Sequence, residues 1–190
     1  MAKDKVKPIT LRGTIYWAHI VKPEQYEGKD TGYYSVLVEL ESEEKTNKLK
    51  SFLEDFWEEN KPEGKLSPKA ELNLSIKETP DGNEAFKAKT KAYDEDDNGT
   101  KVKRKIPIFK GDGTPMEAGT LIGNGSKVQI NVTPSAYRTS TTNYGVTLFL
   151  NAIQVDDLIP YGVKDAAGYG FEKTADPVDT DEEYLEDVEF

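Results

Sequence analysis

Lysines recur at every second position of one short stretch, a spacing that gathers positive charge on one face of a β-strand. Lys87, Lys89 and Lys91 alternate there with apolar or small residues, and side chains two residues apart share a face of an extended strand. A second basic group follows across a short acidic loop and consists of Lys101, Lys103, Arg104 and Lys105. If the two segments form a hairpin, both groups lie on one side and can follow the phosphates of a nucleic acid. The alternative is that these lysines only solvate an outer sheet face and protect its edge.

Aromatic residues are interleaved with these bases along the chain. The candidate nucleic-acid-binding set therefore also contains Arg138 and five aromatic residues: Tyr16, Tyr33, Tyr93, Phe109 and Tyr137. Cations that follow phosphates and rings that stack on exposed bases together make a single-strand binding surface. Since every base has a π-face, such a surface predicts binding without sequence preference.

The last fifteen residues are a second candidate for binding. Positions 176–190 hold eight acids and no base, and Tyr184, Leu185, Val188 and Phe190 stand among the acids. Acids that steer and an aromatic end that anchors suit a basic pocket with an apolar floor. The same acids can compete with phosphates for the basic surface of their own chain. The expected partner-binding residues are Asp181, Glu182, Glu183, Tyr184, Leu185, Glu186, Asp187, Glu189 and Phe190. The alternative is a tail that only adds solubility.

Catalytic arrangements are scarce in this sequence. There is no cysteine, which excludes thiolate chemistry and disulfides, and His19 is the only histidine. The segment 94–105 resembles a calcium loop at its start, but Lys105 stands where the closing acid is needed. Glu84 and Lys87 share one tight hairpin and are poorly spaced for a metal-dependent nuclease. We therefore expect a binding protein, not an enzyme, with no cofactor and no metal.

The elements that would position these residues are mostly strands. Alternating patterns predict strands at 9–21, 33–40, 84–93, 126–137 and 144–155, with a turn at 79–83 preceded by another strand. Gly13 within the first run suggests a bulge or sharp bend. An apolar stripe from Leu49 to Trp57 predicts one amphipathic helix at 42–60, capped by Ser42. The predicted fold is mainly β: a small antiparallel barrel or sandwich with one helix.

The charge divides the chain into a body and a tail. The net charge is −10, of which the eight acids of 176–190 account for most, so residues 1–175 carry about −2. We expect a folded body at 1–162 and a disordered acidic tail at 163–190. No run approaches the ~18 apolar residues of a membrane helix, and no secretory signal is evident. A cytoplasmic protein without membrane contact is the expectation.

Several segments resemble the phage-encoded single-stranded DNA-binding proteins, which are OB-fold proteins of tailed bacteriophages. Residues 179–190 resemble the acidic tail with terminal Phe of the podophage replication proteins, and 121–130 with 144–155 resemble the last barrel strands. The resemblance implies an OB-fold barrel that coats single-stranded DNA in phage replication and recombination, in the cytoplasm of the infected bacterium. It also implies that the tail contacts the phage polymerase and helicase-primase, and that some members form homodimers.

One feature departs from that family. The usual OB helix lies between the third and fourth strands, whereas the helix at 42–60 follows the second predicted strand. Either one strand escapes the count or the helix is an insertion. Two other functions stay open beside DNA binding: a phage protein-interaction module that mimics DNA toward a partner, and a metal-dependent nuclease.

Overall fold

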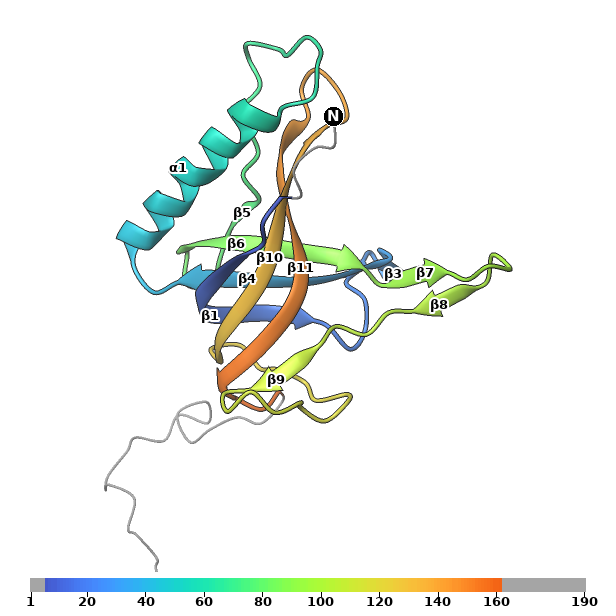
Figure 1. The fold of residues 1–190 in the computed structure, drawn as a ribbon. Helices are drawn as coiled ribbons and strands as arrows, with labels where there is room; N and C mark the ends of the chain where they lie inside the picture. The colour runs from blue at the N-terminus through green and yellow to red at the C-terminus, as the bar shows by residue number, and fades with distance from the viewer. Residues whose placement is uncertain (1–5, 162–190) are drawn as a thin grey trace, which may run out of the picture.

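Five long strands close into a ring. In the structure, a computed structural model that describes residues 6–161, these strands are β1 (Ile9–His19), β4 (Tyr33–Leu40), β6 (Glu84–Lys91), β10 (Lys127–Arg138) and β11 (Tyr144–Asp157). They pair in the order β6-β4-β1-β10-β11, and β11 also pairs with β6 (Figure 1). Over residues 6–161 the architecture is mainly β and OB-fold-like with a single helix, which confirms the predicted fold class for the body of the chain.

The ring closes through a parallel pair. β11 runs parallel to β6, with Leu148 opposite Ala88 and Phe149 opposite Lys89, while the other four pairings of the ring are antiparallel. The sequence predicted an antiparallel barrel. The parallel pairing of β6 with β11 was not predicted, because more than fifty residues of chain separate the two strands. Closure removes the exposed edges that a five-stranded open sheet would present.

Shorter strands decorate the ring. β2 (Gln25–Tyr26) pairs with β3 (Lys29–Asp30), and β7 (Tyr93–Glu95) pairs with β8 (Lys101–Lys103). β5 (Ile76–Glu78) lies at the edge of β6, and β9 (Ile108–Lys110) runs parallel to β11. Lys101 and Lys103 of the second basic group therefore belong to a hairpin of β7 and β8 that projects beyond the end of β6 (Figure 1), and Arg104 and Lys105 follow directly after β8.

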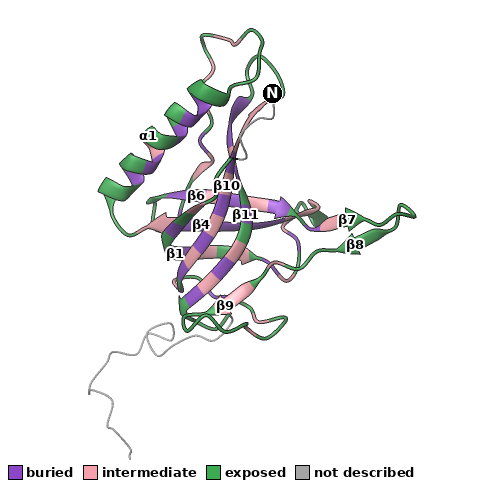
Figure 2. Cartoon of the chain, viewed as in Figure 1, coloured by how far each residue is buried: buried purple, intermediate pink, exposed green. Residues whose placement is uncertain are grey.

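The interior of the ring is filled by alternate residues of all five strands. Ile15, Val36, Phe86, Ile130 and Leu148 are at most 1% exposed. Along β6 the buried residues Phe86, Ala88 and Thr90 alternate with lysines that face outward, as the sequence predicted (Figure 2). Burial of one face thus fixes which side chains of β6 reach solvent.

The helix α1 (Glu43–Asn60) covers one end of the ring. Ser42 caps it, and its hydroxyl accepts a hydrogen bond from the Lys45 N–H at 3.2 Å. Its buried stripe ends on Trp57, which stacks on Tyr144 with ring centroids 5.5 Å apart. α1 lies between the second and third strands of the ring, as the sequence predicted, and the two short strands β2 and β3 that escaped the count pair only with each other, outside the ring.

The first strand changes partners along its length. Gly13 lies opposite both Val128 of β10 and Leu40 of β4, and a Cβ there would come within 1.9 Å of the Glu39 carbonyl oxygen. The glycine thus permits a close backbone approach. The break in register lies further on, between Tyr16 and His19. The expected irregularity of β1 exists, but it centres on Trp17 instead of Gly13.

The remaining expectations for the chain ends are outside the described residues. This holds for the tail at 163–190 and for all nine of its candidate partner-binding residues. Among residues 6–161, no helix is long and apolar enough to span a membrane.

Candidate nucleic-acid interface

The outer faces of the second and third ring strands carry the predicted lysines. In the pairing of β4 with β6, Lys87 lies opposite Leu37, Lys89 opposite Ser35, and Lys91 opposite Tyr33. On the other side of β6, Phe149 of β11 lies opposite Lys89. One continuous outer surface therefore spans β1, β4, β6 and β11, and the lysines run through its middle.

This surface is hollowed where β6 meets β11. The hollow, which we call the central groove, has a volume of about 520 Å³. Its charged and aromatic lining residues are Lys77, Lys87, Lys89, Tyr33, Tyr137 and Phe149, and hydroxyl and amide groups such as Thr139 and Asn143 complete it. Cations and rings from five strands thus meet in one place, as single-strand binding requires.

The rings of the central groove are held in defined positions. The Lys89 ammonium lies 5.0 Å from the centre of the Tyr33 ring, a cation–π contact. The Tyr137 hydroxyl accepts a hydrogen bond from Asn73 Nδ2 at 3.0 Å and donates one to Asn143 Oδ1 at 3.4 Å. Phe149 is 39% exposed although it belongs to a central strand. A flat apolar side chain left exposed between polar neighbours suits stacking.

A second hollow of about 300 Å³ continues the first. This Trp17 hollow shares Lys77 and Lys87 with the central groove. The rest of its lining consists of Trp17, His19, Glu24, Ser35, Val36, Leu37 and Glu78. Trp17 is 46% exposed and adopts a left-handed φ of 46°, and its N–H donates to Asn124 Oδ1 at 2.8 Å. The irregular backbone of β1 presents a tryptophan side chain to solvent at a cost in strain, which is typical of binding sites.

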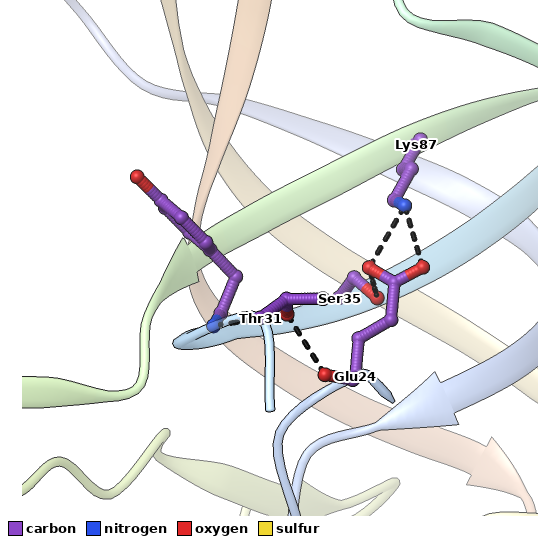
Figure 3. A network of polar contacts seen from close by, with 5 residues as sticks. Glu24, Thr31, Ser35 and Lys87 are labelled. Atoms are coloured by element: carbon purple, nitrogen blue, oxygen red, sulfur yellow. Dashed lines mark hydrogen bonds and ion pairs between the residues drawn. The ribbon is translucent and has the colours of Figure 1, made fainter. Parts of the chain in front are cut away.

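An ion pair lies between the two hollows. Both oxygens of the Glu24 carboxylate accept hydrogen bonds from Lys87 Nζ at 2.8 Å, and Oε2 also accepts one from the Ser35 hydroxyl at 2.9 Å (Figure 3). Burial alone would raise the pKa of Glu24, but the hydrogen bonds from Lys87 and Ser35 and the charge of Lys87 lower it overall. Glu24 is therefore ionised at neutral pH.

Four of the predicted residues lie on or beside the projecting hairpin instead of in the groove. Lys91 ends β6, and Lys101 and Lys103 belong to β8. Lys103 Nζ donates to the Val21 carbonyl oxygen at 2.8 Å. The Tyr93 hydroxyl donates to Asp30 Oδ2 at 2.7 Å, which raises the pKa of Tyr93 and lowers that of Asp30. Some polar side chains of the hairpin are thus already hydrogen-bonded to neighbouring segments of the chain.

Arg104 and Lys105 lie closer to the groove than the rest of the second basic group. They line a shallow hollow of about 380 Å³ that also contains Phe149, a residue of the central groove. Arg104 Nε forms an ion pair with Asp94 at 3.3 Å. These two residues extend the basic surface past the end of β6.

Three predicted residues have other surroundings. Phe109 lies outside the central groove and lines another cavity, of about 430 Å³, which it shares with Lys103, Arg104 and Lys105 of the second basic group. Tyr16 is half-buried opposite Leu37. Its pKa is raised, mainly by burial and secondly by the nearby carboxylate of Glu39. The guanidinium of Arg138 donates to the carbonyl oxygens of Glu63 and Lys65 at 3.4 and 3.2 Å. Its present contacts hold the loop that follows α1.

Among the lysines and the Phe, Tyr and Trp residues that line the two hollows, Trp17, Lys77 and Phe149 were not predicted from the sequence. Phe149 could have been predicted to face solvent, because its neighbours on the same face of β11, Thr147 and Asn151, are polar. Lys77 stands likewise at a position facing the same side as Lys87. No sequence pattern indicated the position of Trp17, since only the break in register of β1 turns its side chain toward the hollow.

The described part of the chain shows no arrangement of side chains suited to a metal ion. Residues 6–161 contain no group of three or more side chains placed to hold a metal ion. The loop that imitates a calcium site is a tight turn in which Asp96 Oδ1 accepts hydrogen bonds from the Asn98 and Thr100 N–H groups. Glu84 pairs with Lys50 of α1.

The fold and this surface define a class of protein: a five-stranded OB-type ring with a hollowed, basic and aromatic face on its second and third strands. OB-folds bind oligonucleotides and oligosaccharides on that face and on the flanking loops. No family model and no curated protein matches the sequence. The solved structures of similar fold are consistent with this class.

Solved structures from bacteriophages share the fold. The chain is similar to gp2.5, a single-stranded DNA-binding protein encoded by bacteriophage T7, with a TM-score of 0.60 and 21% identity over 91% of this chain and 98% of that one. It is also similar to the single-stranded DNA-binding protein from bacteriophage Enc34 in complex with ssDNA, with a TM-score of 0.55 and 16% identity over 82% and 89% of the two chains. The chain therefore has the fold of phage single-stranded DNA-binding proteins.

Proposed function

We propose that this protein binds single-stranded DNA without sequence preference, along the central groove and the Trp17 hollow. The observation that carries the proposal is the meeting of Lys77, Lys87 and Lys89 with Tyr33, Tyr137 and Phe149 in one hollowed face. The lysines attract phosphates, and the rings accept bases of any type. The shared fold of the T7 and Enc34 proteins, one of them solved with ssDNA, supports it.

We propose further that the protein coats single-stranded DNA during phage replication and recombination, in the cytoplasm of the infected bacterium. The resemblance of residues 121–155 and of the tail to phage proteins of this kind supports that setting. The same resemblance supports a homodimer, whose test is the dependence of molar mass on protein concentration. In this proposal the protein is a binding protein that performs no chemical step.

The acidic tail has two proposed roles. Its acids compete with DNA phosphates for the basic groove of the body, and its aromatic end anchors the phage polymerase and helicase-primase. The supporting observation is the composition of 176–190, where eight acids surround Tyr184, Leu185, Val188 and Phe190. Attached to the same chain, such a segment acts at a high effective concentration.

Titration of labelled oligo-dT with the full chain and with a chain lacking residues 176–190 tests both proposals. We expect quenching of Trp17 fluorescence, binding that weakens steeply with salt, and binding about three- to tenfold tighter without the tail. Phe190→Ala is the matched control, because it keeps every acid and should leave DNA affinity unchanged. If neither chain binds oligo-dT at low salt while the tail captures a protein partner, the DNA-mimic alternative is correct.

A further inference from the structure

Glu24 is held firmly at the border of the two hollows. Its N–H donates to the Tyr33 carbonyl oxygen at 2.8 Å, and its own carbonyl oxygen accepts from the N–H and the hydroxyl of Thr31 at 3.0 and 2.8 Å. These contacts tie the loop between β1 and β4 to the beginning of β4 (Figure 3). The carboxylate is therefore presented to the groove in a fixed direction instead of moving with a free loop.

The surroundings of the carboxylate are those that suit a phosphate. Lys87 Nζ contacts both carboxylate oxygens and the Ser35 hydroxyl contacts one of them, each within 2.9 Å. The two non-bridging oxygens of a phosphodiester take the same donors: a lysine ammonium and a hydroxyl. The two side chains of the pair are 31% and 29% exposed, so a polymer can reach them from solvent.

A place for the attached base lies beside this anion position. The Trp17 hollow has a volume of about 300 Å³ and shares Lys87 with the central groove. Trp17 offers an exposed indole on the same lining. A ring and a cation in one hollow are the two groups that one nucleotide of a strand contacts.

We propose that Glu24 is a resident substitute for a backbone phosphate, which single-stranded DNA displaces from Lys87 and Ser35 when a nucleotide enters the Trp17 hollow. This inference rests on the proposed function and adds a nucleotide subsite with a built-in competitor. Binding there exchanges one anion on Lys87 for another, so Lys87 releases no mobile counterion. Glu24 thereby lowers both the affinity for DNA and its dependence on salt.

The test compares two full-length variants that lose the same charge in the same hollow. Glu24→Gln removes the carboxylate that pairs with Lys87, whereas Glu78→Gln removes one that lines the Trp17 hollow but forms no ion pair with another described residue. With labelled oligo-dT we expect Glu24→Gln to bind about three- to tenfold more tightly than the wild type. Glu78→Gln, which removes only the repulsion of phosphates by an unpaired carboxylate, should bind more tightly by less than about twofold. The salt slope of Glu24→Gln should steepen by roughly 0.7, the contribution of one released counterion.

A double-variant cycle separates displacement from general electrostatics. In a Lys87→Gln background, Glu24→Gln should give less than about half of its gain, measured as the logarithm of affinity, because there is no lysine left to release. Equal gains from Glu24→Gln and Glu78→Gln, or weaker binding by Glu24→Gln, would overturn the inference while wild-type binding upholds the proposed function. If the wild type and both variants fail to bind oligo-dT, the proposed function is wrong and the inference falls with it. Thermal unfolding of each variant verifies that it is folded.

Discussion

Two groups of lysines on consecutive segments of the chain have very different surroundings. Lys77, Lys87 and Lys89 line the hollows of the ring beside Tyr33, Tyr137 and Phe149. Lys101 and Lys103 stand on the β7–β8 hairpin, where residues 93–105 contain four acids against four bases. The first group lies in a concave surface beside aromatic rings, whereas the second lies on a projecting arm, where Lys101 is opposite Glu95 and Lys103 is opposite Tyr93.

The difference shows that clustering of bases in sequence does not by itself define a binding surface. A cation at an exposed arm is screened by water and salt and is partly neutralised by neighbouring acids. A cation in a groove keeps more of its interaction with a phosphate, because the neighbouring walls restrict solvent. The groove lysines should therefore dominate binding, although the hairpin holds the denser run of bases in the sequence.

Replacing two groove lysines that form no ion pair with another described residue should have the largest effect. Lys77→Gln with Lys89→Gln removes two cations beside the stacking rings and also the contact of Lys89 with Tyr33. We expect oligo-dT affinity at low salt to fall about thirtyfold or more, and the salt slope to decrease by roughly 1.4, since each lysine contributes about 0.7. Fluorescence titration at several salt concentrations measures both. An unchanged slope would mean that the strand lies elsewhere.

Phe149 should give the next largest effect, because it separates stacking from mere exposure of a ring. Phe149→Ala removes a ring that is 39% exposed in the central groove, and Phe52→Ala removes one that is 42% exposed on α1. Stacking on one base is worth about 1–3 kcal/mol, so Phe149→Ala should weaken oligo-dT binding about tenfold. Phe52→Ala should leave binding unchanged. Equal losses in the two variants would point to a loss of folding, which circular dichroism would show.

Much of the fold could be predicted from the sequence because one face of each long strand is buried. Alternation placed β4 at Tyr33–Leu40 and the beginning of β6 at Glu84, and the apolar stripe with its Ser42 cap placed α1. The closing pair of β11 with β6 was not predictable, because no local pattern encodes a contact over such a separation in sequence. The strand before the turn at 79–83 proved short, since only Ile76–Glu78 pairs with β6.

The candidate site was predictable only where the pattern of β6 fixes the direction of side chains. Lys87 and Lys89 follow from that pattern, and Tyr33 and Tyr137 lie with them in the groove. The separate cavity around Phe109 and the loop contacts of Arg138 depend on tertiary packing that no spacing reveals. Glu24 likewise looked like one acid in a polar loop, and only the fold brings it to Lys87.

The smallest effect should come from the hairpin, and it completes the comparison. Lys101→Gln with Lys103→Gln removes the same number of charges as the groove pair, but from β8, where Lys101 lies opposite Glu95 and Lys103 contacts Val21. We expect oligo-dT affinity to fall less than about threefold, with a salt slope that changes by less than the value for one full phosphate contact. A loss as large as that of the groove pair would show that the arm closes over the strand. In that case the hairpin, with Arg104 and Lys105 at its base, would form a second wall of the binding surface.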